Sequence, residues 1–192
     1  LHPRVRRQRQ MCIRDRRVSG KRPLAISLDN YYKNREYIPL GADGKPDLEC
    51  LESIDVPLFN DQLVELLAGR EVELPLYSFK TKRRLEQSVR LRVDGDQVLV
   101  VEGIHGLNSA LSEEIPSELK YRVYVSALTQ LNLDGHNRIR TTDVRLLRRM
   151  VRDARTRHTD VTATMAMWDS VRAGEEKYIL SLIHISEPTR PY

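Results

Sequence analysis

Two short apolar segments, each followed directly by an acidic residue, constrain the fold of this chain most strongly. Residues 23–28 read PLAISL and precede Asp29, and residues 98–101 read VLVV and precede Glu102. Neither segment alternates polar with apolar residues, which is typical of inner strands of a parallel sheet. Apolar residues at helical spacing follow in three other segments: 56–68, 141–157 and 163–178. Strands that alternate with helices predict an α/β fold with a parallel sheet and flanking helices.

Three further segments have strand character. Residues 71–79 read as extended chain, but Pro75 lacks an amide hydrogen and argues against a central position in a sheet. Residues 89–93 are a predicted strand, separated from the VLVV segment by the turn-forming residues 94–96. Residues 121–127 are apolar enough to form another inner parallel strand.

The positive charge of the chain is concentrated at its N-terminus. The net charge is +5, but residues 1–22 hold nine basic residues and one acid and so contribute +8. The other 170 residues, with 23 basic and 26 acidic side chains, have a net charge of −3. A basic tail is compatible with a nucleic-acid-binding module, but a domain of net negative charge argues against nucleic acid as a partner.

Targeting and redox signals favour a cytoplasmic protein. No apolar run approaches the roughly 20 residues that span a bilayer, and the basic N-terminus is not followed by the apolar stretch of a secretory signal. The two cysteines, Cys12 and Cys50, make neither a disulfide framework nor a metal-ligand spacing. We therefore expect a reducing, cytoplasmic setting and no membrane as partner.

The two ends of the chain differ in character from its middle. Residues 11–16 (MCIRDR) and 181–192 (SLIHISEPTRPY) resemble translated sequencing-adapter tails. We expect residues 1–16 and 180–192 to be non-native tails, and residues 17–179 to be an incomplete domain. Real disordered termini are the alternative.

The tripeptide SGK at 19–21 invites a phosphate-loop assignment that the sequence does not support. The motif G-x-x-x-x-G-K-[ST] requires a glycine where the chain has Asp15, and a serine or threonine where it has Arg22. A predicted strand, not a helix, follows Lys21. Gly20 is instead expected to end a helix.

Asp29 and Glu102 are the first candidate site residues. The carboxyl ends of parallel strands share one edge of a sheet, where open α/β sheets bind their ligands, and both acids fall at such ends. One carboxylate can accept the proton of an attacking hydroxyl, and the other can hold magnesium, directly or through water. The pair suits a phosphotransferase; the alternative is that Asp29 caps a turn and Glu102 is a solvated strand end.

Six arginines crowd the predicted helix at 141–157. They are Arg145, Arg148, Arg149, Arg152, Arg155 and Arg157. Guanidinium groups match the geometry of phosphate oxygens and can spread the charge of a transition state. A solvated amphipathic helix, with Asp153 paired to some of the arginines, is the alternative explanation.

Taken in order, these segments resemble the uridine kinase / phosphoribulokinase family. The resemblance is carried by LAISLDNYYKNRE, ESIDVPLFNDQL, GREVELPLYSFKTKRR, VLVVEGIHGLN, RVYVSALTQLNLDGHNRI, TTDVRLLRRMVRDARTR and WDSVRAGEEKYI, within about residues 17–179. It implies a P-loop kinase fold whose first strand, phosphate loop and last strand would lie outside this chain. It also implies transfer of the γ-phosphate of ATP or GTP to the 5′-hydroxyl of a nucleoside, with magnesium as cofactor. Without the loop, we expect the chain by itself to be inactive.

The resemblance implies an acceptor site built from five residues. Asp29 would accept the proton of the nucleoside hydroxyl as the catalytic base, and Tyr32 would line the same pocket. Glu49 would contact the ribose hydroxyls, while Tyr77 and Phe79 would pack around the base.

The resemblance also implies a phosphate side. Glu102 would hold magnesium, most simply through water. Arg149 would reach the substrate, whereas Arg152 and Arg157 would contact the donor phosphates and take part in catalysis. Residues 153–175 would form a mobile lid.

Two positions depart from the pattern of uridine kinases and leave the substrate open. Lys82 and Thr159 stand where those enzymes usually have a histidine and an arginine. A sister kinase acting on ribulose phosphate, pantothenate or another small alcohol is the main alternative, and the basic segment KTKRR at 80–84 is compatible with it. The expected partner is a nucleoside or a similar small alcohol, and a homo-oligomer is compatible with the sequence.

Overall fold

The computed structural model describes three stretches of the chain, namely residues 20–41, 44–125 and 132–185. The predicted tail at 1–16 lies outside them. Of the predicted tail at 180–192, only the part up to residue 185 is described, and it forms a short 3₁₀ helix.

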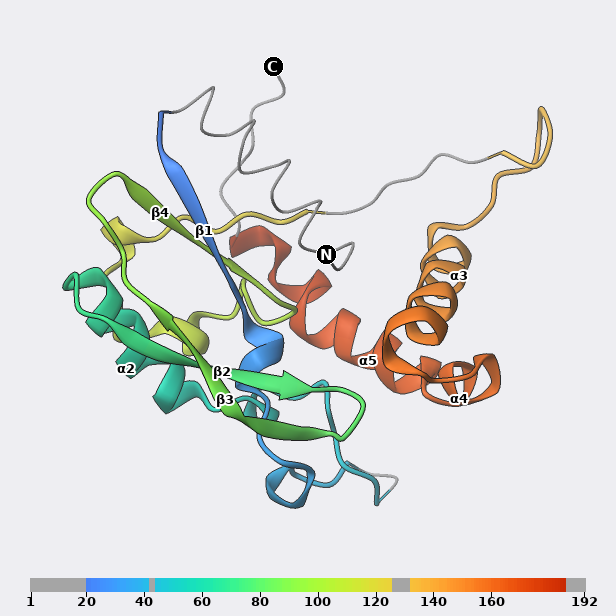
Figure 1. Cartoon of the computed structure of the whole chain (residues 1–192). Helices are drawn as coiled ribbons and strands as arrows, with labels where there is room; N and C mark the ends of the chain where they lie inside the picture. The colour runs from blue at the N-terminus through green and yellow to red at the C-terminus, as the bar shows by residue number, and fades with distance from the viewer. Residues whose placement is uncertain (1–19, 42–43, 126–131, 186–192) are drawn as a thin grey trace.

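A parallel pair of strands lies at the centre of the fold. Figure 1 shows β1 (Arg22–Ser27) beside β4 (Gln97–Glu102), and their register places Ser27 opposite Glu102. These strands are the two apolar segments with acidic ends. Together with the flanking helices they confirm the predicted α/β fold with a parallel sheet.

The two faces of β4 differ in burial. Leu99 and Val101 pack against the hydrophobic core, to which Ile26 of β1 also belongs. On the opposite face, Val98 and Val100 are 47% and 46% exposed. The prediction that this strand is apolar on both faces is correct, but within the described residues only one face is covered.

Helix α2 (Val56–Leu67) forms where its terminal signals predict it. The Asp55 side chain caps the helix by accepting a hydrogen bond from the Leu58 amide at 3.3 Å. Gly69 ends the helix with a φ of +74°, a left-handed conformation that glycine adopts without strain. The buried face of the helix enters the core through three side chains: Phe59, Leu63 and Leu66.

A separate antiparallel hairpin joins β2 (Val72–Ser78) to β3 (Arg83–Leu91). The register is irregular between Pro75 and Tyr77, because a proline cannot donate to the ladder. The expectation that Pro75 stays out of a central strand is met, since β2 pairs only with β3 in the described part of the chain.

Arg84 ties the hairpin to the segment that follows β1. Its guanidinium donates to the backbone oxygens of Tyr31 and Tyr32, each at 3.1 Å. The same group forms an ion pair of 3.0 Å with Asp55, the cap of α2. The position of the hairpin relative to the end of β1 is therefore fixed by one half-buried side chain.

The C-terminal helices are shorter than the sequence predicted. Helix α3 (Thr141–Arg152) ends in a π-helical turn (Asp153–Arg157), so the predicted helix at 141–157 is one α-helix with a wider last turn. The predicted helix at 163–178 is two helices, α4 (Val161–Ala166) and α5 (Trp168–Tyr178), separated at one residue. Figure 1 shows α5 between the strands and the α3–α4 pair.

One strand prediction is wrong for the residues that can be assessed. Residues 121–125 have no regular secondary structure, and residues 126–127 lie outside the described ranges. Apolar composition is not sufficient for a strand, since membership of a sheet also requires a neighbouring strand with free backbone groups. Among residues 20–41, 44–125 and 132–185, none of the helices combines the length and the apolar character needed to cross a membrane.

The link through Asp55 can be tested by two substitutions. Asp55→Ala should lower the free energy of unfolding by about 1–2 kcal/mol, because the α2 cap and the ion pair with Arg84 are both lost. Asp55→Asn keeps a capping oxygen and should cost less. Urea denaturation measures both, and equal losses in the two variants would contradict the role of the cap.

Candidate active site

One cavity of about 1690 Å³ opens at the carboxyl ends of β1 and β4. It is larger than the roughly 300–1,000 Å³ of a usual small-molecule pocket, so it has room for more than one ligand. Its lining includes every site residue predicted from the sequence: Asp29, Tyr32, Glu49, Tyr77, Phe79, Glu102, Arg149, Arg152 and Arg157. The structure thus brings all nine together, while their chemical roles stay predictions.

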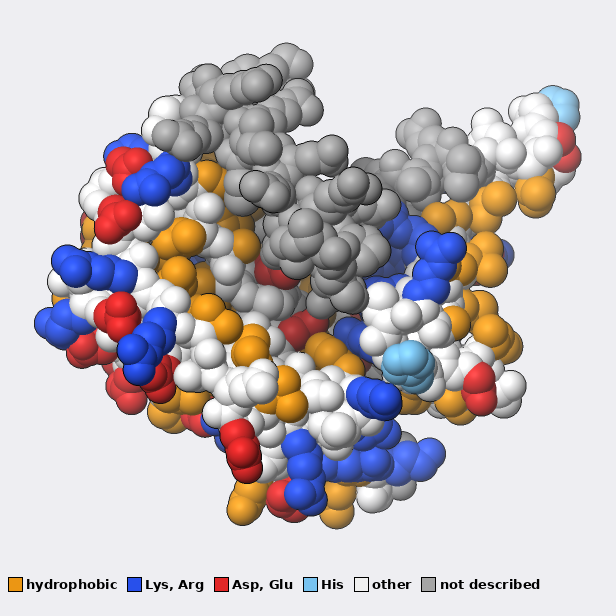
Figure 2. All heavy atoms as spheres, in the orientation of Figure 1, with side chains coloured by type: hydrophobic (Ala, Val, Ile, Leu, Met, Phe, Trp, Pro, Cys, Tyr) orange, Lys and Arg blue, Asp and Glu red, His pale blue; other side chains and the backbone are white. Residues whose placement is uncertain are grey.

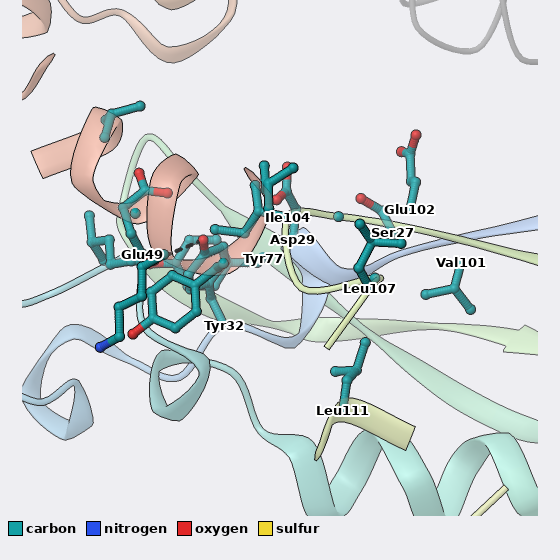
Figure 3. A pocket seen from close by; sticks show the side chains of 18 of the residues that line it. Ser27, Asp29, Tyr32, Glu49, Tyr77, Val101, Glu102, Ile104, Leu107 and Leu111 are labelled. Atoms are coloured by element: carbon teal, nitrogen blue, oxygen red, sulfur yellow. Dashed lines mark hydrogen bonds between the residues drawn. The ribbon is translucent and has the colours of Figure 1, made fainter. Parts of the chain in front are cut away.

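The two predicted acids lie where their strands end. Asp29 is in the 3₁₀ helix Leu28–Tyr31 directly after β1, and Glu102 is the last residue of β4. Figure 3 shows both carboxyl groups on the same side of the strands, with Ser27 nearby. Both side chains line the one cavity, as the register of the parallel pair leads us to expect.

Three aromatic rings form one wall of the cavity. Ring centroids of Tyr32 and Tyr77 are 5.6 Å apart, those of Tyr77 and Phe79 5.3 Å, and those of Tyr32 and Phe79 6.2 Å. Tyr77 is near the end of β2, and Phe79 is the first residue after that strand. Burial is the main cause that raises the pKa of Tyr32, whose hydroxyl donates to the Leu48 carbonyl at 3.0 Å. A flat, apolar ligand fits such a wall.

Arg157 connects the aromatic wall to the acid after β1. Its guanidinium carbon lies 4.3 Å from the centroid of the Phe79 ring, in cation–π geometry. The same guanidinium is 4.0 Å from the carboxylate of Asp29. A cation at this place attracts a negative group that approaches Asp29.

Asp153 is a buried carboxylate that gathers three arginines. It is 1% exposed, and its oxygens lie 3.3 Å from Arg149, 3.4 Å from Arg152 and 3.6 Å from Arg157. The π-helical turn that starts at Asp153 brings Arg157, four residues later, to the same carboxylate. One negative charge thus orients three positive ones, and the excess charge suits a ligand with several phosphate oxygens.

The crowding of these cations affects Arg152. Burial and the neighbouring Arg157 lower the pKa of Arg152 from its usual range, although an arginine stays charged at neutral pH. From the sequence, Asp153 is expected only to pair with arginines on a solvated helix, whereas the structure buries it. Its spacing, with arginines at i−4, i−1 and i+4, is the signal that could have identified it.

Glu49 is a half-buried acid of the site. Burial raises the pKa of its carboxyl group, while Arg149 and Arg157 act in the opposite direction. The residue lies in the loop before the 3₁₀ helix Leu51–Ser53, and Figure 3 shows it beside Tyr32 and Tyr77. A ligand with hydroxyl groups can replace the hydrogen bonds with water that this carboxylate loses.

Glu102 is the residue predicted to hold magnesium. It is exposed at the end of β4, with Ser27 opposite it in the register. Magnesium is commonly bound by one or two carboxylates together with phosphate oxygens and water. Within the described ranges no group of three or more His, Cys, Asp or Glu side chains could hold a metal ion by itself. The residues therefore fit an ion that arrives with a nucleotide, not a closed metal site.

Comparison with known proteins agrees with this geometry. The family model described as "Phosphoribulokinase / Uridine kinase family" matches residues 25–184. A uridine kinase of Bacillus pumilus is 26% identical over 177 residues, covering 92% of this chain and 72% of the relative. A uridine kinase of Schizosaccharomyces pombe is 31% identical over 157 residues, or 80% of this chain and 31% of the relative. A uridine kinase of Clostridium botulinum is 27% identical over 146 residues, which cover 76% of this chain and 62% of the relative.

The charge hub at Asp153 leads to a first prediction about the site. Asp153→Asn keeps the shape of the side chain but leaves three arginines without their shared anion, so it should lower the free energy of unfolding by about 3 kcal/mol. Added sulfate should restore part of this loss by binding between the arginines. Asp61→Asn, on the exposed side of α2, is the control. Equal effects of sulfate on the two variants, in thermal unfolding, would refute the hub.

Glu49 leads to a prediction about pH. Its pKa is raised in the folded state, so the native protein holds a proton that the unfolded chain has already lost, and stability falls as pH rises through the folded pKa. Glu49→Gln removes this effect. The variant should gain stability over the wild type at pH 7 and lose the advantage near pH 4. Urea midpoints at the two pH values measure this, with the exposed Glu113→Gln as control; a pH-independent difference would contradict it.

Proposed function

Because the chain belongs to the phosphoribulokinase / uridine kinase family, a family of kinases, we propose that its site serves transfer of the γ-phosphate of ATP or GTP to the 5′-hydroxyl of a nucleoside. The observation that carries the proposal is the single cavity that joins an aromatic wall, a half-buried acid, a carboxylate at a strand end and a cluster of arginines. Each of these features matches one part of a nucleoside and a nucleotide.

The acceptor side follows from the shape of the nucleoside. The base packs against the rings of Tyr77 and Phe79, and Tyr32 closes the wall. The half-buried carboxylate of Glu49 accepts hydrogen bonds from the ribose hydroxyls. The 5′-hydroxyl then reaches Asp29, which accepts its proton as the oxygen attacks the phosphate.

The donor side depends on positive charge. Arg152 and Arg157 bind the transferring phosphate oxygens, and Arg149, on the same buried carboxylate, faces the substrate. Such preorganised donors are worth most where charge develops in the transition state. Glu102 would hold magnesium, which neutralises the charge of the phosphates when it is bound.

We also propose that residues 153–175 act as a lid. Arg157 lies over Phe79 and beside Asp29, in the space where the acceptor has to bind. An acceptor that enters this space displaces the guanidinium, and the segment that carries Arg157 has to adjust. The π-helical turn and the left-handed residue after it, His158 (φ +53°), are the places where the backbone is least regular.

A second candidate function has one observation in its favour. Arg35, Lys45 and Lys82 line the same cavity as the aromatic wall. Figure 2 shows Lys and Arg side chains gathered over the lower edge of the visible face, where the β2–β3 hairpin turns. A sister kinase with a phosphorylated or carboxylated alcohol as acceptor would use these cations for the second anion of its substrate.

Binding of acceptors distinguishes the two functions and requires no turnover. In calorimetric titrations the chain should bind uridine, and Phe79→Ala should weaken this binding by roughly tenfold or more, because a stacked base contributes about 1–3 kcal/mol. Tyr37→Ala, an aromatic residue that is 70% exposed, is the matched control. Tighter binding of ribulose 5-phosphate or pantothenate than of any nucleoside would instead favour the sister kinase.

A further inference from the structure

A buried glycine of α5 lies against Glu49, the half-buried acid of the proposed acceptor site. Gly174 is buried in the helix interior, and a Cβ atom added there would lie 2.6 Å from Cβ and 3.1 Å from Cγ of Glu49. Real side chains do not approach so closely, so any larger residue would force one partner to move. A glycine inside a helix is unfavourable by about 0.5–1 kcal/mol relative to alanine. Close approach to Glu49 is the physical reason for this residue.

Helix α5 is held where it is by its neighbouring residues. Glu175, 6% exposed, pairs with Arg145 of α3 at 2.8 Å and with Arg172 at 2.6 Å. One turn later the ring of Tyr178 packs against the buried His105, with centroids 4.9 Å apart. The helix that carries position 174 is therefore held by contacts on both sides of this residue, and these contacts oppose its displacement by an added side chain.

The backbone of the loop that carries Glu49 is held as well. The Glu49 amide donates to the Asp47 carboxylate at 3.0 Å, and the Cys50 thiol donates to the Asp47 carbonyl at 3.1 Å. The Tyr32 hydroxyl donates to the Leu48 carbonyl at 3.0 Å. The closest approach is to Cβ of Glu49, whose place is set by the loop backbone, so a side chain at 174 would have to shift that backbone, and the carboxylate would move with it.

We propose that Gly174 is a positioning residue that holds the Glu49 carboxylate against the acceptor, and thereby sets a preference for acceptors with a vicinal diol. The inference rests on the proposed function, because it takes Glu49 as the acceptor of hydrogen bonds from ribose. It assigns a specificity role to a residue without any polar side chain.

The test compares two nucleosides that differ only in the diol. Uridine and 2′,3′-dideoxyuridine are titrated by calorimetry into the wild-type chain and into Gly174→Ala, Glu49→Ala and the double variant. In Gly174→Ala, uridine should bind roughly tenfold more weakly or worse, whereas dideoxyuridine should be nearly unaffected. In the Glu49→Ala background, Gly174→Ala should have no further effect on the ratio of the two affinities.

The matched control is Gly95→Ala. A Cβ at Gly95 meets nothing within 4 Å, so this substitution should change neither affinity. Gly174→Ala with an unchanged ratio of affinities, or with equal weakening of both nucleosides, would overturn the proposal. A wild-type chain that binds neither nucleoside would instead overturn the proposed function on which the inference rests.

A folding measurement keeps the test decisive if Gly174→Ala is unstable. Glu49→Gly removes the Cβ that a residue at 174 would meet at 2.6 Å. Gly174→Ala should therefore lower the melting temperature by less in the Glu49→Gly background than in the wild type. An equal loss in both backgrounds would mean that the two residues do not interact, and the proposal would fail.

Discussion

The parallel register of β1 and β4 is the constraint on which the site depends. Because Ser27 pairs with Glu102, the chain leaves both strands at the same level, and the two exits cross closely. Gly103 makes the crossing possible, since a Cβ there would lie 2.7 Å from the side chain of Leu28, which is 1% exposed. The segment after β1 then turns at once into the 3₁₀ helix that carries Asp29. Two strands thus deliver two carboxylates to one cavity without a long loop.

Negative and positive side chains lie next to one another along the cavity, and an anionic ligand can bind to the positive ones. The Asp153 carboxylate sits under three guanidinium groups, one of which also reaches Asp29. Three cations near one buried anion repel one another, and the lowered pKa of Arg152 has Arg157 among its causes. A phosphate group that enters relieves this repulsion and finds its donors already oriented, so less ordering is needed at the moment of transfer. Because the three guanidinium groups repel one another, the Asp153 carboxylate has to lie close to all of them.

The features that depend on local sequence could be predicted, whereas those that depend on distant contacts could not. Asp29 and Glu102 were correctly placed at one edge because apolar strands with acidic ends need no tertiary information. Helix α3 was predicted to reach residue 157, and periodicity alone cannot show that its last turn widens around the carboxylate of Asp153. The strand expected at 121–127 is irregular up to residue 125, because pairing depends on a partner far away in the chain.

The approach of Gly174 to Glu49 could not be predicted from the sequence for the same reason, since the two residues are far apart along the chain and no spacing indicates that they meet. The contacts of α5 show what else this approach affects. Within residues 174–178 the helix touches the acceptor acid, pairs with Arg145 of the arginine helix and packs on His105. A displacement of α3 toward a phosphate therefore has to pass through the helix that fixes Glu49. Under the proposed function, recognition of the acceptor and binding of the phosphates would be connected through the contacts of α5 with Glu49 and Arg145.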